Sequence, residues 1–315
     1  MWQRLWLFST LSSLLLMNTS TAAGHRLAIQ GNDKLAIVDA EGKVEWELKW
    51  GGIHDIHVLP NGNIMVQQGA AKVVEIDVKT KKVIWSYDSV KMNGNEGKKI
   101  EVHAFQPLED GKVMIAESGP GRIIEIDREG KLLLEFKLKV KHNDPHRDTR
   151  LVRKLATGTY LVCHEGDGIV REYDKEGKIT WEYEVPLFDR KPAGGHGPEA
   201  WGNQTFAAVR LPNKNTLIST GNGHGVIEVT PEKKIVWQVE QKDLKDITLA
   251  WVTTLEVLPN GNYVIGNCHA GKGQPLLVEI EPKTKKVVWT FDQFDVWGNS
   301  VSNTQLLDIK GDHLR

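Results

Sequence analysis

The sequence predicts an all-β protein, a six-bladed β-propeller built from four-stranded antiparallel blades, and three observations support this. A short turn of the form Leu-Pro-Asn-Gly-Asn, or a relative of it, occurs at five places along the chain. An aromatic pair of the form Trp-x-Tyr, or a relative, occurs six times. The last residues of the chain resemble the one strand that the first repeat lacks.

The segment 54–87 shows how each blade is built. An apolar run meets Asn61-Gly62, a pair typical of tight β-hairpins in which both residues take positive φ. Further apolar runs are separated by a small-residue loop and by a short turn rich in lysine. The four strands predicted from this pattern cover residues 53–59, 64–67, 73–77 and 83–87, and they form one antiparallel meander.

The other blades follow by repetition of these two features. The hairpin turn lies at residues 59–63, 108–112, 155–159, 211–215 and 258–262. The aromatic pair of the last strand begins at Trp46, Trp85, Leu134, Trp181, Trp237 and Trp289. Since a ligand site would not need a tryptophan in nearly every repeat, these residues are predicted to pack neighbouring blades together.

A half-repeat remains at each end of the chain. The first copy begins at its second strand, near residues 26–30, and the segment 302–309 can supply the missing first strand. The sequence therefore predicts a ring that is closed by a C-terminal strand completing the N-terminal blade. A ring closed in this way leaves no free sheet edge.

Residues 1–23 have the pattern of a secretory signal peptide. An early arginine precedes an apolar core at 5–17, and small residues precede Gly24. This predicts a secreted or periplasmic protein with a single propeller domain at 24–315. The apolar run is short for a spanning helix, so no stable membrane span is expected after cleavage.

Composition narrows the class of partner. The formal net charge of the 315-residue chain is -1, which argues against binding nucleic acid by bulk electrostatics. Cys163 and Cys268 fall in non-adjacent blades, too far apart for a disulfide, so both are predicted to be buried thiols.

Polar side chains are predicted to gather at the end of the ring where the innermost strands begin, which we call the top. Aligning the blades places His54, His103 and Arg150 level with one another at the mouth of the central channel, and we take them as catalytic candidates. Other top-face residues are predicted to bind ligand: Gln68, Glu117, His164, His224, Asn267, His269 and Asn303, with Trp201 and Trp297 from a recurring Trp-Gly motif.

Three chemistries fit such a funnel. A divalent metal could be held by imidazoles and a carboxylate, and the natural ligands are His54, His103, His164 and Glu117. A histidine could instead act as nucleophile or general base while Arg150 holds an anionic group. The funnel could also bind without reacting, and its histidines could simply bond neighbouring loops and channel waters. The sequence leaves the metal content open.

The strands VVEIDVKTKKVIWSY and LLVEIEPKTKKVVWTF resemble the repeats of the quinoprotein-like (PQQ-like) propeller superfamily. The members of that superfamily that bind pyrroloquinoline quinone use adjacent cysteines, which this chain lacks, so that cofactor is not expected. His54-Asp55 followed by Leu-Pro-Asn-Gly-Asn resembles a motif of arylsulfotransferase-like six-bladed propellers. That resemblance implies sulfuryl transfer through a histidine, with His54 or His103 as nucleophile and Arg150 as the group that holds the anion.

The leading hypothesis is an exported propeller whose top funnel binds a small anionic or sugar-like ligand and acts on it by group transfer or hydrolysis. Exposed tryptophans beside a polar cleft would suit the stacking of a sugar ring. The alternative is a non-catalytic propeller that presents its top loops to a glycan or protein partner.

Overall fold

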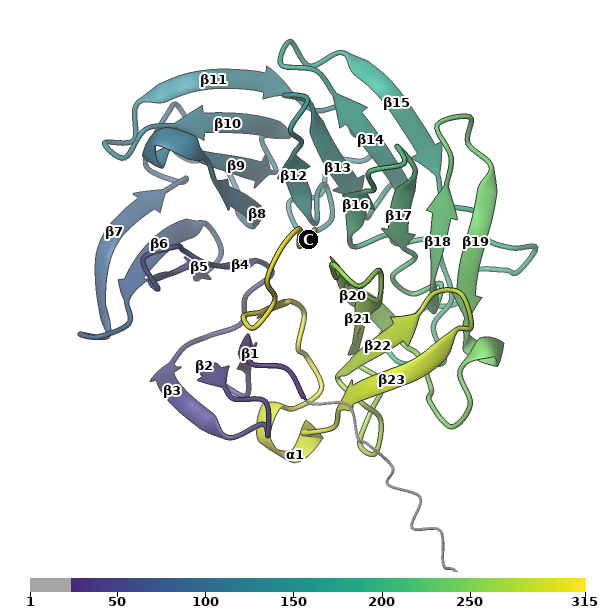
Figure 1. The fold of residues 1–315 in the computed structure, drawn as a ribbon. Coiled ribbons are helices and arrows are strands. Elements are labelled where there is room, and N and C mark those ends of the chain that lie inside the picture. The colour runs from purple at the N-terminus through teal and green to yellow at the C-terminus, as the bar shows by residue number, and fades with distance from the viewer. Residues whose placement is uncertain (1–23) are drawn as a thin grey trace, which may run out of the picture.

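The computed structural model describes residues 24–315, so the predicted signal peptide lies outside the described residues. Six four-stranded antiparallel sheets stand like blades around a central axis (Figure 1), which confirms the predicted propeller. Among these residues no helix has both the length and the apolar character that crossing a membrane requires.

In every blade four strands follow one another from the innermost, at the central axis, to the outermost. Blade one is β24 (Thr304–Leu306), β1 (Leu27–Gly31), β2 (Lys34–Val38) and β3 (Val44–Lys49). Blade two is β4 (Ile56–Val58), β5 (Ile64–Gln68), β6 (Lys72–Asp77) and β7 (Lys82–Asp88). Blade three is β8 (Glu101–Pro107), β9 (Val113–Ser118), β10 (Arg122–Ile126) and β11 (Leu132–Lys137).

Blade four is β12 (Val152–Lys154), β13 (Tyr160–His164), β14 (Ile169–Tyr173) and β15 (Ile179–Glu184). Blade five is β16 (Ala208–Arg210), β17 (Thr216–Ser219), β18 (Gly225–Val229) and β19 (Ile235–Glu240). Blade six is β20 (Trp251–Val257), β21 (Tyr263–Cys268), β22 (Leu277–Glu281) and β23 (Lys286–Phe291). The short helices are η1 (Glu109–Gly111), η2 (Gln241–Asp243) and α1 (Phe294–Trp297).

The ring closes as the half-repeats predict. Strand β24 pairs antiparallel with β1, and Leu306 lies opposite Leu27. The first blade therefore takes its innermost strand from the far end of the chain, and the sheet edge that β1 would otherwise expose is paired.

The repeated hairpin turn differs from the prediction in one detail. Gly62 has φ 85°, but Asn61 is not among the residues with positive φ, so the expectation that both turn residues would be left-handed is wrong. The amide of Gly62 donates to the carbonyl oxygen of Leu59 over 2.8 Å, and Pro60 precedes Asn61. Proline fixes φ at about −65°, which suits the second position of a type I turn. Only Gly62, the last of the four turn residues, then has positive φ.

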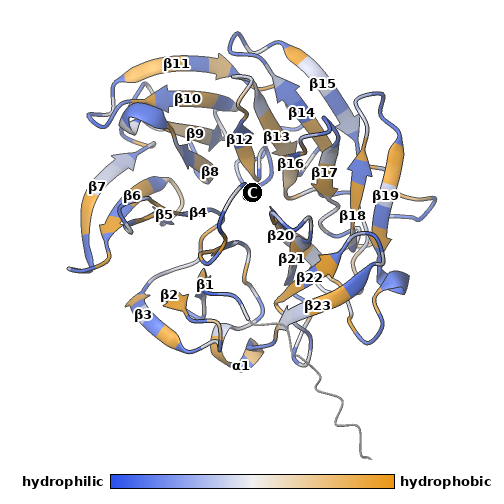
Figure 2. Ribbon diagram, viewed as in Figure 1, coloured by the Kyte–Doolittle hydropathy of each residue, from blue (hydrophilic) through white to orange (hydrophobic). Residues whose placement is uncertain are grey.

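The hydrophobic core is divided among the joints between blades. Each of the six clusters of buried apolar residues combines side chains from neighbouring blades. Figure 2 shows the hydrophobic colour concentrated on the strands, while the connecting loops are mostly hydrophilic. Burying apolar area is the main favourable term in folding, so each blade is stable only beside its neighbours.

The outer-strand tryptophans contribute to these joints. The indole N–H of Trp46 donates to the carbonyl oxygen of Val78 in blade two over 2.8 Å. The same bond to the next blade is made by Trp85, Trp181 and Trp237, at 2.6, 3.1 and 2.8 Å respectively. The predicted packing role is thereby confirmed for these residues. Both cysteines are buried and unpaired, as predicted.

One buried carboxylate joins four innermost strands near the channel axis. Asp55 precedes β4, is fully buried, and accepts bonds from both terminal nitrogens of Arg153 at 2.8 and 2.9 Å. It also accepts the backbone N–H of Phe105 in blade three and a side-chain N–H of Asn303 beside blade one, each at 3.2 Å. Burial opposes the charge of Asp55, but Arg153 and His57 outweigh it and hold its pKa below the usual range.

The last residues of the chain enter the channel from the opposite end to the top, and Figure 1 shows the C-terminus near the axis. Leu314 pairs with Val257 of β20 through two backbone bonds of 2.8 and 3.1 Å. A terminal nitrogen of Arg315 donates to the carbonyl oxygen of Ile56 over 2.6 Å. The C-terminal residues line a second cavity at this end, of about 510 Å³, together with His57 and Arg153.

The joint between blades six and one contains a histidine held between two carboxylates. His25 lies 3.0 Å from both Glu279 and Asp308. Burial disfavours its charged form, but the bonds to these two carboxylates outweigh burial and raise the pKa of His25 above its ordinary value.

We expect the substitution His25→Gln to destabilise the protein more at pH 5.5 than at pH 9. A raised folded-state pKa gives stability that is fully present below the unfolded value of about 6.5 and is lost as pH rises through the folded value. Urea unfolding of both proteins at the two pH values measures the difference. An equal loss of stability at both values would show that the protonated form of His25 contributes nothing.

Candidate functional site

A cavity of about 700 Å³ opens at the top of the propeller. Its walls come from the loops that enter the innermost strands and from the loops between second and third strands. The residues that line it include His54, Gln67, Glu101, His146, Arg147, Arg150, Glu165, His196, Phe206, Trp251, Thr253 and His269.

His54 enters this cavity from the loop before β4. Its backbone N–H donates to the side-chain oxygen of Gln67 over 3.1 Å, which fixes the loop. Its ring stands edge-on to that of His103, with centroids 4.5 Å apart, and its Nδ1 is buried without a hydrogen-bond partner among residues 24–315. Burial, followed by the positive neighbours His103 and Arg150, holds the pKa of His54 well below its ordinary value. His54 is therefore a neutral imidazole with a free lone pair at neutral pH.

Arg150 stands at the start of blade four, where its backbone N–H donates to the carbonyl oxygen of Cys163 over 2.8 Å. Its Nε donates to the carboxylate of Glu165, and its guanidinium lies 5.6 Å from the centre of the Phe206 ring. Its Nη1 is buried and has no partner among the described residues. A buried N–H of a charged group is costly to leave unpaired, so this nitrogen is suited to an anionic oxygen.

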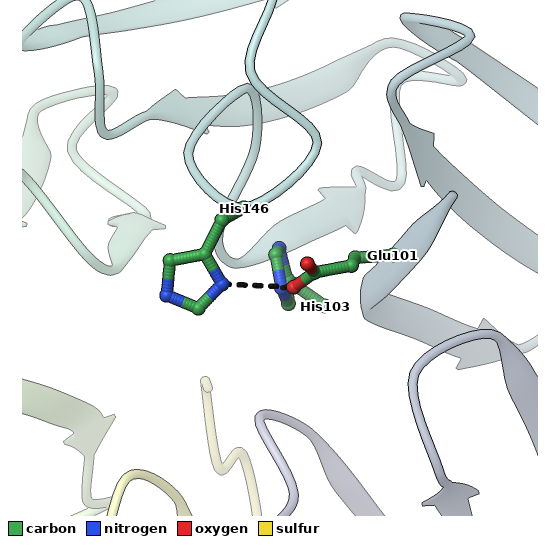
Figure 3. Close-up of side chains that lie close together, drawn as sticks. All are labelled: Glu101, His103 and His146. Carbon is green, nitrogen blue, oxygen red and sulfur yellow. Dashed lines mark hydrogen bonds and ion pairs between the residues drawn. The ribbon is translucent and has the colours of Figure 1, made fainter. Parts of the chain in front are cut away.

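His103 and Glu101 share one face of β8. The pairing of β8 with β9 shifts between Val102 and Ala104, a bulge that gives His103 no partner in the register. Figure 3 shows the two side chains converging with His146 from the loop between β11 and β12. Oε2 of Glu101 lies 3.0 Å from Nε2 of His103 and 2.8 Å from Nδ1 of His146.

Burial lowers the pKa of His103 to about 4. The contact with His103, followed by that with His146, lowers the pKa of Glu101 to about 2. Glu101 is thus a carboxylate at neutral pH, in contact with two imidazoles at the edge of the cavity.

Of the three catalytic candidates, His54 and Arg150 line the cavity, and His103 lies directly behind His54. Phe206, just before β16, and Thr253, in β20, also line it. The alignment of innermost strands therefore identified residues that the fold brings together.

Several predicted ligand-binding residues instead bond within the protein, outside the cavity wall. His164 is fully buried between the carbonyl oxygen of Asp148 at 2.8 Å and the hydroxyl of Tyr173 at 2.9 Å. Glu117 accepts from Arg122 over 2.6 Å. The other side chains of this kind are Asn267, which accepts from Ala250, and Asn303, which donates to His54 and Asp55. Gln68 is exposed at the end of β5, and its neighbour Gln67 lines the cavity.

The remaining predicted residues lie in three places. His269 lines the cavity, with its ring centre 5.3 Å from that of His196. Trp201 and His224 line a separate cavity of about 230 Å³. Trp297 is fully buried in α1, and its indole N–H donates to the side-chain oxygen of Gln293 over 3.0 Å.

Sequence reasoning assigned no role to Glu101, His146 or Glu165. One signal was available for Glu101, because it precedes His103 by two residues and such residues share a face of a strand. His196, from the loop between β15 and β16, stacks on Trp251 of β20 with ring centres 5.3 Å apart. The repeat pattern does not predict that this loop reaches β20.

The model of a family described as outer membrane protein assembly factor BamB matches residues 31–291. No curated protein matches the chain. A protein of unknown function from Bacteroides caccae superposes with a TM-score of 0.72 at 22% identity, covering 89% of this chain and 98% of that one.

Two further solved structures are more distant. A catalytically inactive variant of virginiamycin B lyase from Staphylococcus aureus, with quinupristin, gives a TM-score of 0.54 at 13% identity over 87% of this chain and 85% of that one. The WD40 propeller domain of Doa1 gives 0.53 at 14% identity over 76% and 71%. At these identities the likeness is one of fold alone.

Proposed function

Since the chain belongs to the BamB family of PQQ-like propellers, we propose that it is an exported propeller whose top cavity binds a small anionic ligand. The ligand class is a molecule that carries a sulfate, phosphate or carboxylate group. Sulfuryl transfer, which the resemblance to arylsulfotransferase-like propellers implies, is a prediction within this proposal.

One observation carries the proposal: two buried nitrogens that have no partner within residues 24–315, Nη1 of Arg150 and Nδ1 of His54, belong to residues that line the same cavity. A buried polar atom is normally paired, and an unpaired one in a cavity wall is suited to a ligand. The guanidinium would hold the anionic group by charge-assisted bonds. Phe206 and the stacked pair of His196 and Trp251 give the ligand an apolar wall.

The same geometry suits proton or group transfer. Neutral His54 has a lone pair, so it can take a proton from a bound ligand or attack its anionic group, which Arg150 would hold and polarise. Export, to the periplasm or beyond, is part of the proposal and depends on residues 1–23.

The test compares the wild-type protein with the double variant Arg150→Gln/Glu165→Gln, which removes both charges of a buried pair and leaves polar side chains in their place. We expect the variant to lose at least about tenfold in affinity for the anion, since bonds to charged groups contribute about 1.5–3 kcal/mol. Calorimetric titration with sulfate, phosphate, glucuronate, 4-nitrophenyl sulfate and 4-nitrophenyl phosphate measures affinity, and release of nitrophenol measures turnover.

The matched control is Arg26→Gln/Glu45→Gln, an exposed ion pair on blade one. It should bind each probe as the wild-type protein does. If the wild-type protein binds none of these probes, or if the cavity variant binds them unchanged, the proposal is wrong.

The family description favours a second function, because an assembly factor acts on other proteins. In that case the top loops would dock a protein partner and the cavity would carry out no reaction. A partner captured by crosslinking at His142, on the loop between β11 and β12, and retained by the double cavity variant would support this second function.

A further inference from the structure

Three side chains at the edge of the cavity have the composition of a metal centre. Nε2 of His103, Nδ1 of His146 and a carboxylate oxygen of Glu101 all lie within 4.8 Å of one another. Two imidazoles and one carboxylate form the protein ligand set of catalytic zinc sites that keep an open position, and also of non-haem iron sites.

Two of the three spacings between these atoms are close to those of ligands sharing one ion. Atoms bound to one Zn²⁺ at about 2.0–2.2 Å lie roughly 3 to 3.6 Å apart. Here the carboxylate oxygen lies 3.0 Å from the nitrogen of His103 and 2.8 Å from that of His146. His146 is on a loop with 57% of its side chain exposed, so its ring has room to turn toward an ion.

The hydrogen bond of His103 to the backbone sets which ring nitrogen faces Glu101. Its Nδ1 lies 3.0 Å from the carbonyl oxygen of Thr149, an atom that only accepts, so the Nδ1–H donates there. Nε2 is then the ring nitrogen that faces the carboxylate of Glu101, 3.0 Å away. The side chain of His103 is completely shielded from water.

The hydrogen bond from Nδ1 of His103 to the carbonyl oxygen of Thr149 is also typical of histidines that bind a metal. An imidazole that binds a metal through one nitrogen usually donates its other N–H to a carbonyl or carboxylate, which fixes the ring orientation and tautomer. Glu101 and His146 line the cavity, so an ion held here would have its open position on the side of His54 and Arg150.

We propose that Glu101, His103 and His146 bind one divalent transition-metal ion of the zinc class, with an open coordination position facing the top cavity. The ion would add a Lewis acid beside the two unpaired nitrogens of His54 and Arg150. This inference does not depend on anion binding, because it concerns different side chains and has its own measurement.

The test uses the full chain stripped of metal with EDTA and titrated with Zn²⁺ alone by calorimetry, and with Co²⁺ followed by its visible absorption bands. We expect one equivalent of Zn²⁺ to bind. The variant His146→Ala should bind at least about tenfold more weakly, since even outer partners of metal ligands change affinity by about 10–100-fold. Glu101→Gln should weaken binding as well.

His142→Ala is the matched control, because His142 is an exposed histidine on the same loop outside the cluster. It should bind Zn²⁺ as the wild-type protein does. Both His146 and His142 are exposed, so neither variant is expected to disturb folding, and circular dichroism verifies this. Absence of stoichiometric binding in the wild-type protein would overturn the proposal, as would equal affinity of the wild-type and His146→Ala proteins.

The two proposals fail separately. Anion titrations of the EDTA-treated protein report on Arg150 and His54 without the ion. Zinc binding without anion binding would leave the metal site standing and refute the anion proposal, and the reverse result would refute the metal site alone.

Discussion

Replacing Asp55 with alanine should lower the free energy of unfolding by about 3–5 kcal/mol, because it leaves a buried guanidinium without its counter-ion. Arg153 is itself buried and places two terminal nitrogens on this carboxylate. The same change removes the acceptor for the backbone N–H of Phe105. Urea unfolding followed by tryptophan fluorescence measures the loss.

Two further variants identify the cause. The double change Asp55→Leu/Arg153→Met removes both charges, and we expect it to be less destabilising than Asp55→Ala, since buried ion pairs can often be replaced by apolar residues of similar volume. Glu45→Ala removes one partner of an exposed pair and should cost only about 0–1 kcal/mol. If Asp55→Ala costs no more than this surface change, Asp55 does not join the blades.

Trp297→Ala should also cost about 3–5 kcal/mol, the range for removing a large aromatic side chain from a core. Trp297 is fully buried in the cluster between blades six and one. Its backbone lies so close to β1 that a Cβ on Gly31 would come within 2.2 Å of the Trp297 carbonyl oxygen, which leaves the neighbouring backbone little freedom to collapse into the gap. Thermal unfolding and calorimetry measure the effect.

The same variant distinguishes the two roles considered for this tryptophan. Trp297→Phe keeps most of the volume and should lose mainly the bond to Gln293, which contributes about 0.5–1.5 kcal/mol. A protein that stays fully stable as Trp297→Ala but loses anion affinity would contradict the packing role and support a ligand contact.

The fold was predictable because its signals are local and repeated. Each Asn-Gly or related turn and each outer tryptophan reports the same four-stranded unit, so an error in one copy is corrected by the others. Even ring closure was visible, since segment 302–309 had no other blade to join. The conformation of Asn61 was not predictable from the dipeptide alone, because the turn takes a form in which only its glycine has positive φ, as it also does at Thr157-Gly158, where no proline precedes.

The site was predictable only where it depends on the repeats. His54 and Arg150 lie just before innermost strands, so alignment of the blades placed them together at the channel. Position in a blade did not reveal that His164 bonds to Tyr173 or that Glu117 bonds to Arg122, because those partners are set by individual side chains. His146 and His196 come from long loops whose paths no repeat specifies.

The pairing of β24 with β1 also sets an order of events during folding. Blades two to six consist of consecutive strands, so each can form from local contacts soon after its own residues are available. Blade one needs strands from both ends of the chain and must close a loop of nearly the whole chain length. Its contacts have the highest contact order in the molecule, so the ring is completed last, and both the channel network around Asp55 and the finished top cavity depend on that final step.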